Sequence, residues 1–157
     1  MATITRLEEN NFYALSGAIA ETHDYDWLVQ HIFLDENVTV RNVTDEYGVL
    51  VLTGPGSRDV LSKLTDADLS NQEFPWLRGK SIDVSGIQTR ALRVSYAGEL
   101  GWELHLPMEN VSKQYDKSME AGAEFGIVNF GTYVVNSLRL EKASDGAATL
   151  ITLPIDK

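Results

Sequence analysis

The feature that most constrains the fold is a run of three extended stretches separated by short glycine-containing turns. The stretches cover residues 81–84, 87–96 and 102–106, and the turns are Ser-Gly at 85–86 and Ala-Gly-Glu-Leu-Gly at 97–101. Extended segments joined by glycine turns of two to five residues are typical of β-hairpins. Three in succession predict an antiparallel meander.

A strand–turn–helix unit is predicted before the meander. Residues 47–52 are almost continuously apolar, which indicates a strand buried on both faces, and the alternating residues 38–42 are expected to form a strand that pairs with it. Thr-Gly-Pro-Gly at 53–56 ends the strand. Ser57 can then cap a helix whose buried face comprises Val60, Leu61 and Leu64.

Two helices are predicted after the meander. Pro107 ends the last strand, and apolar residues at helical spacing indicate a helix over one sheet face, which Gly122 can terminate through a left-handed cap. Thr132 could cap a last helix that runs through Lys142. The residues expected to face inward are Val111, Tyr115 and Met119 in the first helix, and Val134 and Leu138 in the second, with Val135 as a further candidate.

The N-terminal segment predicts a hairpin and a short helix. Residues 4–15 are extended around the polar turn 8–11, and Asp24 can cap a helix that runs to Phe33 with its apolar stripe facing the core. Together these elements indicate an α+β fold, with helices packed on a mainly antiparallel sheet.

Composition excludes several functions. The 157 residues match one ordinary domain, and the formal net charge of −10 disfavours binding to nucleic-acid backbones. There is no cysteine, which excludes disulfides and thiolate metal sites, and no apolar run of the roughly 20 residues needed to cross a bilayer. We therefore expect a soluble, intracellular protein without a membrane or nucleic-acid partner.

Motif chemistry is sparse. The sequence has no Walker loop, no dinucleotide fingerprint and no nucleophile elbow, and Thr-Gly-Pro-Gly at 53–56 is interpreted only as a turn. The histidines His23, His31 and His105 lack paired metal-ligand spacing, so no metal site is expected. His31 is expected to pack on its helix, and His105 to be solvated or hydrogen-bonded.

The strongest local signal surrounds Glu103. In its strand Trp102, Leu104 and Leu106 share one face, which places Glu103 on the other face beside His105. The residue is then either solvated or lines a cavity where it hydrogen-bonds a ligand. Tyr96, on the neighbouring predicted strand, could supply an aromatic wall with a hydroxyl at its rim.

Six blocks of sequence, spread in order over residues 5–142, support a family resemblance. They read Thr-Arg-Leu-Glu-Glu-Asn-Asn-Phe-Tyr at 5–13, Thr-His-Asp-Tyr-Asp-Trp at 22–27, Leu-Thr-Gly-Pro-Gly-Ser-Arg at 52–58, Leu-Thr-Asp-Ala-Asp-Leu-Ser-Asn at 64–71, Arg-Val-Ser-Tyr-Ala-Gly-Glu-Leu-Gly-Trp-Glu-Leu-His at 93–105 and Asn-Ser-Leu-Arg-Leu-Glu-Lys at 136–142. The chain thereby resembles the aminomethyltransferase-like region of dimethylglycine and sarcosine dehydrogenases, which is itself similar to the glycine-cleavage T protein.

The resemblance implies ferredoxin-like elements of the T-protein fold and binding of tetrahydrofolate. A one-carbon unit would pass to the folate from a small methylated amine, such as dimethylglycine or sarcosine, or from glycine. It further implies that Glu103 holds the pterin ring and that Tyr96 lies against the folate. A carboxylate can accept two hydrogen bonds from the aminopyrimidine edge of a pterin, which fits the independent interpretation of Glu103.

The sequence also departs from the family pattern. The family's catalytic aspartate lies upstream of the block at 5–13, so no catalytic residue is assigned, and a folate-contacting arginine is replaced by Val135. Arg139 and Glu141 face different directions on their helix and are expected to make structural pairs. We expect a partial folate-binding domain at 1–142, a divergent tail at 143–157 and a chain that is truncated and inactive alone.

The alternative is a non-catalytic interaction module that reuses the fold, in which two copies could pair as a homodimer and bury apolar surface. Any FAD would belong to a domain outside these residues, since no dinucleotide fingerprint is present. The expected location is the cytoplasm, or the mitochondrial matrix in a eukaryote.

Overall fold

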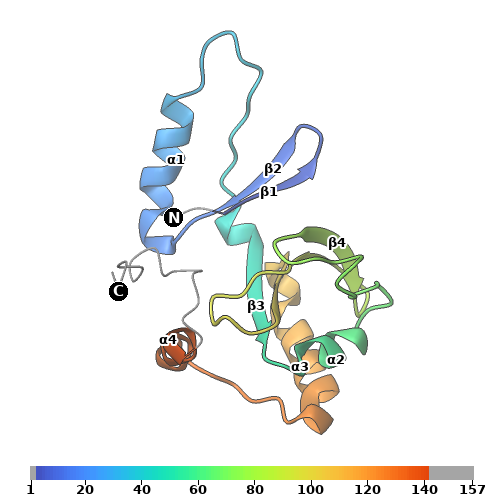
Figure 1. Ribbon diagram of the computed structural model, residues 1–157. Helices are drawn as coiled ribbons and strands as arrows, with labels where there is room; N and C mark the ends of the chain where they lie inside the picture. Colours follow the sequence, from blue (N-terminus) through green and yellow to red (C-terminus); the bar gives the residue numbers. More distant parts are fainter. Residues whose placement is uncertain (1–2, 142–157) are drawn as a thin grey trace, which may run out of the picture. The chain divides into compact units, whose positions relative to one another are not determined.

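The computed structural model of the chain describes residues 3–141 (Figure 1). The chain divides into two compact units, Met1–Glu46 and Tyr47–Lys157. No helix in the described part is long and apolar enough to cross a membrane. The tail expected at 143–157 lies outside the described residues.

The first unit begins with the predicted hairpin. Strands β1 (Thr3–Glu8) and β2 (Asn11–Leu15) pair antiparallel. A short 3₁₀ turn, Ala18–Ala20, leads into helix α1 (Glu21–Gln30). The helix therefore begins before Asp24, which lies in its first turn instead of capping it.

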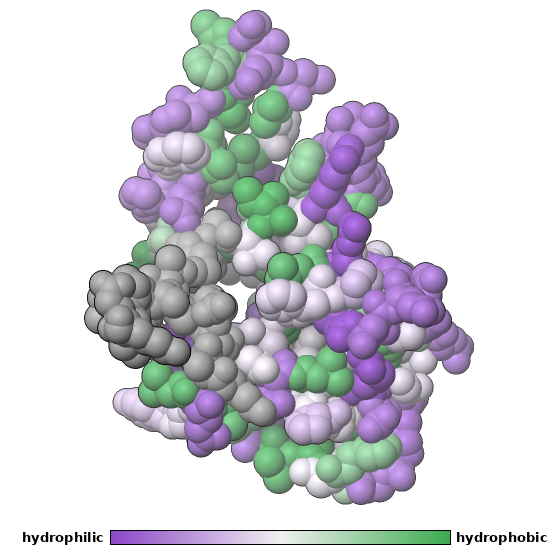
Figure 2. Space-filling model, in the orientation of Figure 1, coloured by the Kyte–Doolittle hydropathy of each residue, from purple (hydrophilic) through white to green (hydrophobic). Residues whose placement is uncertain are grey.

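The expected buried stripe of α1 is absent. No residue of this helix is buried, and Trp27, Leu28 and Phe33 are all exposed. Trp27 instead stacks on His31, with 4.1 Å between the ring centroids. Figure 2 shows apolar side chains at the surface along this helix and the segment that follows it.

The prediction of a strand at 38–42 is also wrong. Asn42 forms a local turn in which its Oδ1 accepts hydrogen bonds from the backbone N and Oγ1 of Thr44, and its Nδ2 donates to Glu21 at 2.7 Å. Such side-chain bonds to nearby backbone compete with strand pairing. A 3₁₀ turn, Thr44–Glu46, follows directly.

The second unit contains one antiparallel sheet of four strands (Figure 1). Its strands are β3 (Tyr47–Thr53), β4 (Gly79–Val84), β5 (Ile87–Leu92) and β6 (Gly101–Pro107), in the spatial order β3-β6-β5-β4. The predicted meander β4-β5-β6 is confirmed. β3 pairs with β6, and not with the segment before it.

Helices α2 (Ser57–Ser62) and α3 (Val111–Gly122) belong to this unit and pack on one face of the sheet, where they enclose the core. The core contains fully buried aromatic and aliphatic side chains from both strands and helices, including Leu61, Phe74, Val84, Trp102, Leu104 and Leu106. Of the buried face predicted for α2, Val60 and Leu61 are confirmed, whereas Leu64 lies after the end of the helix and packs against the core partly buried.

Three predicted details of this unit are wrong. β3 is an edge strand and not buried on both faces, because Val49 and Val51 remain exposed while Leu52 is buried. Ser57 does not cap α2: it is the first helical residue, and its Oγ donates to the Leu100 carbonyl oxygen. In the stripe predicted for α3, Val111 and Met119 are half-buried but Tyr115 is exposed, and the buried side chains are Gln114 and Ser118.

Gly122 does not provide the left-handed cap that the sequence suggested. Its φ is −85°, and the chain continues through a 3₁₀ turn, Ala123–Phe125, to Gly126, where φ is 70°. Gly122 serves a close approach, because a Cβ there would lie 2.6 Å from Ile127 Cγ2. α4 (Thr132–Glu141) follows and has no buried residue; Val135 and Leu138 are partly buried and Val134 is exposed.

The β4–β5 turn allows a stability prediction. Ser85 has φ 56° and Gly86 has φ 83°, the left-handed pair of a type I′ hairpin turn, which favours Asn-Gly. Ser85→Asn should raise the free energy of unfolding by about 0.5–1 kcal/mol, because asparagine tolerates φ > 0 better than serine. Urea denaturation would measure the change. A lower free energy for Ser85→Asn than for the parent chain would contradict the turn assignment.

Candidate functional site

Glu103 lies in β6, beside a buried histidine. Its side chain is 28% exposed, whereas that of His105 is 2% exposed, and His105 Nε2 lies 3.3 Å from Glu103 Oε2. The alternation predicted from sequence is confirmed, because Trp102, Leu104 and Leu106 are buried in the core on the other face. The prediction that His105 is hydrogen-bonded is confirmed too, and its burial rules out the solvated alternative.

The neighbouring strands give Glu103 a largely apolar frame. In the sheet register Glu103 lies opposite Val51 of β3 and Leu92 of β5, while Arg90 lies opposite His105. Hydrogen-bond donors offset the cost of removing a carboxylate from water, and His105 donates one when its Nε2 carries the proton. The free carboxylate oxygen can accept further hydrogen bonds from a ligand.

Tyr96 lies in a loop and not on a strand as predicted, because β5 ends at Leu92. The hairpin pairing extends one residue further, where the Arg93 amide donates to the Arg78 carbonyl at 2.8 Å. The Val94 amide then donates back to the Leu92 carbonyl at 3.0 Å, and this tight turn takes the chain out of the sheet. Tyr96 is 45% exposed, and the Arg139 guanidinium of α4 lies over its ring, 5.3 Å from the centroid.

Arg139 is the residue that the sequence interpretation missed at this site. The residue was expected to make a structural pair, and the structure places its guanidinium over the ring of Tyr96. Its Nε is buried and has no hydrogen-bond partner. The signal available in the sequence was its spacing: Arg139 lies one helical turn after Val135, on the same side of the helix.

A second missed feature joins two glycine-rich motifs. The carbonyl oxygen of Leu100 accepts hydrogen bonds from Gly54 N at 2.8 Å, Ser57 Oγ at 3.0 Å and Thr53 Oγ1 at 3.3 Å. Gly101 makes the approach possible, because a Cβ there would lie 2.9 Å from the Leu52 carbonyl oxygen. The motif at 53–56, interpreted as a turn, thus also fixes the start of β6.

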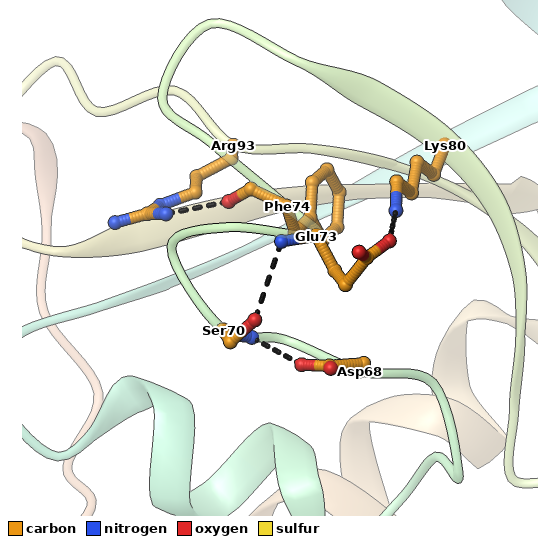
Figure 3. Close-up of polar contacts among 6 residues, drawn as sticks. All are labelled: Asp68, Ser70, Glu73, Phe74, Lys80 and Arg93. Carbon is orange, nitrogen blue, oxygen red and sulfur yellow. Dashed lines mark hydrogen bonds and ion pairs between the residues drawn. The ribbon is translucent and has the colours of Figure 1, made fainter.

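The loop before β4 is held by short-range polar contacts (Figure 3). The Ser70 amide donates to Asp68 Oδ1 at 2.7 Å, and this bond, with that of the Ser70 hydroxyl, lowers the pKa of the exposed Asp68 carboxyl below its ordinary value. Glu73 N donates to Ser70 Oγ at 3.2 Å, and Lys80 Nζ lies 3.8 Å from Glu73 Oε2. The carboxylates of this loop are therefore used structurally.

No group of three or more histidine, aspartate or glutamate side chains within residues 3–141 could hold a metal ion. A surface pocket is lined by residues 62–67 together with Ile82, Asp83 and Ser85, none of which was a candidate site residue. The chemically distinctive positions are thus Glu103 with His105, and Tyr96 with Arg139.

Comparisons with known proteins agree with this architecture. The model of the family described as "GCVT N-terminal domain" matches residues 2–146. Dimethylglycine dehydrogenase, mitochondrial, from Homo sapiens is 46% identical over 142 residues, and sarcosine dehydrogenase, mitochondrial, from Mus musculus is 37% identical over 134 residues. Aminomethyltransferase from Caldanaerobacter subterraneus subsp. tengcongensis is 32% identical over 133 residues.

The coverage of these relatives is uneven. The matches span 90%, 83% and 84% of this chain but only 16%, 14% and 35% of the relatives, in that order. A solved chain of heterotetrameric sarcosine oxidase from Corynebacterium sp. U-96 superposes with a TM-score of 0.66 at 21% identity, and the match covers 82% of this chain and 63% of that one. The structural likeness confirms the predicted α+β fold with its antiparallel sheet.

Proposed function

Because the chain belongs to the family of GCVT N-terminal domains, we propose that it is the tetrahydrofolate-binding segment of a one-carbon transfer protein. The one-carbon unit would come from a small methylated amine, such as dimethylglycine or sarcosine, or from glycine. Relatives named dimethylglycine dehydrogenase, sarcosine dehydrogenase and aminomethyltransferase support this range of donors.

The observation that supports the proposal best is the environment of Glu103. Its carboxylate is partly exposed, flanked by Val51 and Leu92, and hydrogen-bonded on one oxygen to His105. The second oxygen can accept from the amino group and ring N–H of a pterin. Removing such a donor from the ligand would leave the second carboxylate oxygen without a hydrogen bond in a partly buried site, which makes the site selective for pterins.

Tyr96 would contribute a flat wall for the folate. Its ring is exposed enough to contact a ligand and is backed by the Arg139 guanidinium. A cation on one face of the ring restrains its orientation, by about 0.5–1 kcal/mol at exposed sites. Arg139 is thus proposed to position Tyr96, at a place where the family-like arginine is replaced by Val135.

The described residues provide binding groups and no assigned proton donor or acceptor. We propose that catalysis and any FAD belong to other parts of a longer protein, because the chain spans less than a fifth of the length of the dehydrogenase relatives. The relatives' names place them in mitochondria, so the proposed location is the mitochondrial matrix, or the cytoplasm in a bacterium.

A second candidate function is a non-catalytic interaction module. The observation that favours it is the edge strand β3. Val49 and Val51 of this strand are exposed, and its outer edge pairs with no other strand among residues 3–141. Exposed apolar edges are sites of strand addition between chains. Two copies could pair there and form the homodimer.

Calorimetric titration with folinic acid, a stable reduced folate, tests the first proposal. We expect the chain to bind, and Glu103→Gln to weaken binding at least about tenfold, because hydrogen bonds to a charged group contribute roughly 1.5–3 kcal/mol. Glu109→Gln is the matched control, since Glu109 is exposed beyond the end of β6.

Circular dichroism would verify that both variants are folded. Equal affinity of Glu103→Gln and the parent chain would refute the role of Glu103. If no variant binds, sedimentation velocity on the parent chain and on Val51→Lys becomes the decisive measurement: a dimer that the lysine dissociates supports the interaction module.

A further inference from the structure

Two arginines lie over the buried indole of Trp102, on the side of the sheet that faces the core. The guanidinium carbon of Arg58, in α2, is 5.9 Å from the ring centroid, and that of Arg93, just after β5, is 5.7 Å from it. Trp102 itself is fully buried and also contacts the tilted ring of Phe74, 6.3 Å away. Both cations are thereby held at one edge of the core.

The hydrogen-bond partners of these arginines are neutral. Arg58 Nη2 donates to the Asn71 side-chain oxygen at 2.7 Å, and Arg93 Nη1 donates to the Phe74 carbonyl oxygen. Figure 3 shows one guanidinium nitrogen of Arg93 bonded to the Phe74 carbonyl oxygen, while the other terminal nitrogen points away from the loop. Each guanidinium therefore retains unused donors.

Charge balance at this position is unusual for an acidic protein. The chain has a formal net charge of −10, yet neither guanidinium forms an ion pair with a carboxylate among residues 3–141. The Nε atoms of Arg58 and Arg93 are buried without a partner, as are Trp102 Nε1 and Ser95 Oγ. Burial, and then the charge of Arg58, lowers the pKa of Arg93 below its ordinary value.

We propose that Arg58 and Arg93 form a binding site for an oxyanion, a carboxylate or a phosphate group, at the edge of Trp102. The Nη donors that Asn71 and Phe74 do not occupy match the two coplanar oxygens of such groups. A bound anion would offset the charge of the two arginines and relieve the repulsion between them.

This site is separate from the one proposed for folate. Trp102 and Glu103 are adjacent in β6, so their side chains point to opposite faces of the sheet. The oxyanion proposal therefore stands or falls independently of folate binding. The competing explanation is that both arginines only stack on the indole, in which case added anions would have no specific effect.

The Trp102 indole N–H is a built-in reporter for the test. The chain has three tryptophans, so a ¹H–¹⁵N correlation spectrum of the ¹⁵N-labelled protein shows three indole N–H signals. The signals of Trp27 and Trp76 are identified by their loss in Trp27→Phe and Trp76→Phe, which leaves the signal of Trp102. Sodium phosphate and sodium succinate are titrated separately, at constant ionic strength balanced with sodium chloride. Constant ionic strength removes general screening from the comparison.

We expect a saturable shift of the Trp102 signal with phosphate, succinate or both, and the stronger ligand identifies the oxyanion class. Arg58→Gln should raise the fitted dissociation constant at least tenfold. It is preferred to a change at Arg93, whose bond to Phe74 supports the loop. Arg78→Gln is the matched control, because Arg78 is exposed in the same unit and should leave the titration unchanged.

Two results would overturn the proposal. One is a Trp102 signal that moves no more with phosphate and succinate than with chloride. The other is a saturable shift that Arg58→Gln preserves at the parent affinity while the variant keeps the parent spectrum elsewhere.

Discussion

Trp102→Ala is expected to destabilise the second unit strongly. The side chain is fully buried, contacts Phe74 and lies beneath two guanidinium groups, so its removal leaves a large cavity and exposes the edge of the core. Truncation of a buried tryptophan to alanine costs about 3–5 kcal/mol. Domains of this size are stable by only about 5–15 kcal/mol, so the variant should be marginal. Urea denaturation followed by circular dichroism would measure the loss.

The control for this change is Trp76→Ala, because Trp76 is 67% exposed. Its free energy of unfolding should stay within about 0.5 kcal/mol of the parent value. A milder variant, Trp102→Phe, keeps an aromatic ring and should fall between the two. If Trp102→Ala cost less than about 1 kcal/mol, the assignment of this residue to the core would be wrong.

Gly122→Ala should destabilise the same unit by about 1–3 kcal/mol, which is the usual cost of overpacking. The added Cβ would lie 2.6, 2.7 and 2.8 Å from three atoms of Ile127, one of them the Cβ of that residue. Ile127 cannot move aside by a rotamer change alone, since its Cβ is fixed by the backbone. The end of α3 and the segment after it would have to separate, which denaturant unfolding would detect.

Two further glycine variants separate steric crowding from backbone strain. Gly126→Ala adds a Cβ in open space but at φ 70°, so its cost of about 1–2 kcal/mol would come from the left-handed backbone alone. Gly131→Ala has neither problem and should be close to neutral. A neutral Gly122→Ala would show that the contact with Ile127 is loose.

The sheet was predictable because local signals agreed with its long-range pairing. Turn residues and alternation around Gly86 specify the β4–β5 hairpin, and Pro107 marks the end of β6. The segment 38–42 shows the limit of this reasoning. Its alternation is typical of a strand, but strand pairing needs a partner, and the partner of β3 is β6, which lies far along the chain.

The two glycines at the end of α3 show a second limit. By residue type alone, Gly122 and Gly126 are equally suitable for a left-handed cap. The structure uses Gly126 for the left-handed backbone, and it uses Gly122 where Ile127 leaves no room for a side chain. For α1 the apolar spacing was real, but spacing does not reveal whether a surface exists to cover that stripe.

Of the candidate site, the sequence predicted the pair Glu103 and His105 but not the surroundings of Tyr96. Strand alternation placed Glu103 and His105 together on one face, and the structure confirms that pair. Tyr96 was assigned to the wrong element, because a tight turn, in which the Val94 amide donates to the Leu92 carbonyl, ends β5 early and has no sequence signature. The contact of Arg139 with Tyr96 joins residues far apart in sequence, and such contacts follow from tertiary packing alone.

The pairing of β3 with β6 has a consequence for how the protein is made. Tyr47 pairs with Pro107 and Thr53 with Gly101, so β3 leaves the ribosome well before its partner strand exists. Contacts of such large sequence separation form slowly, and until they form the apolar strand is available to other chains. Glu103 acquires its neighbour Val51 in the same event, so the site proposed around Glu103 should form late in folding, together with the closure of the sheet.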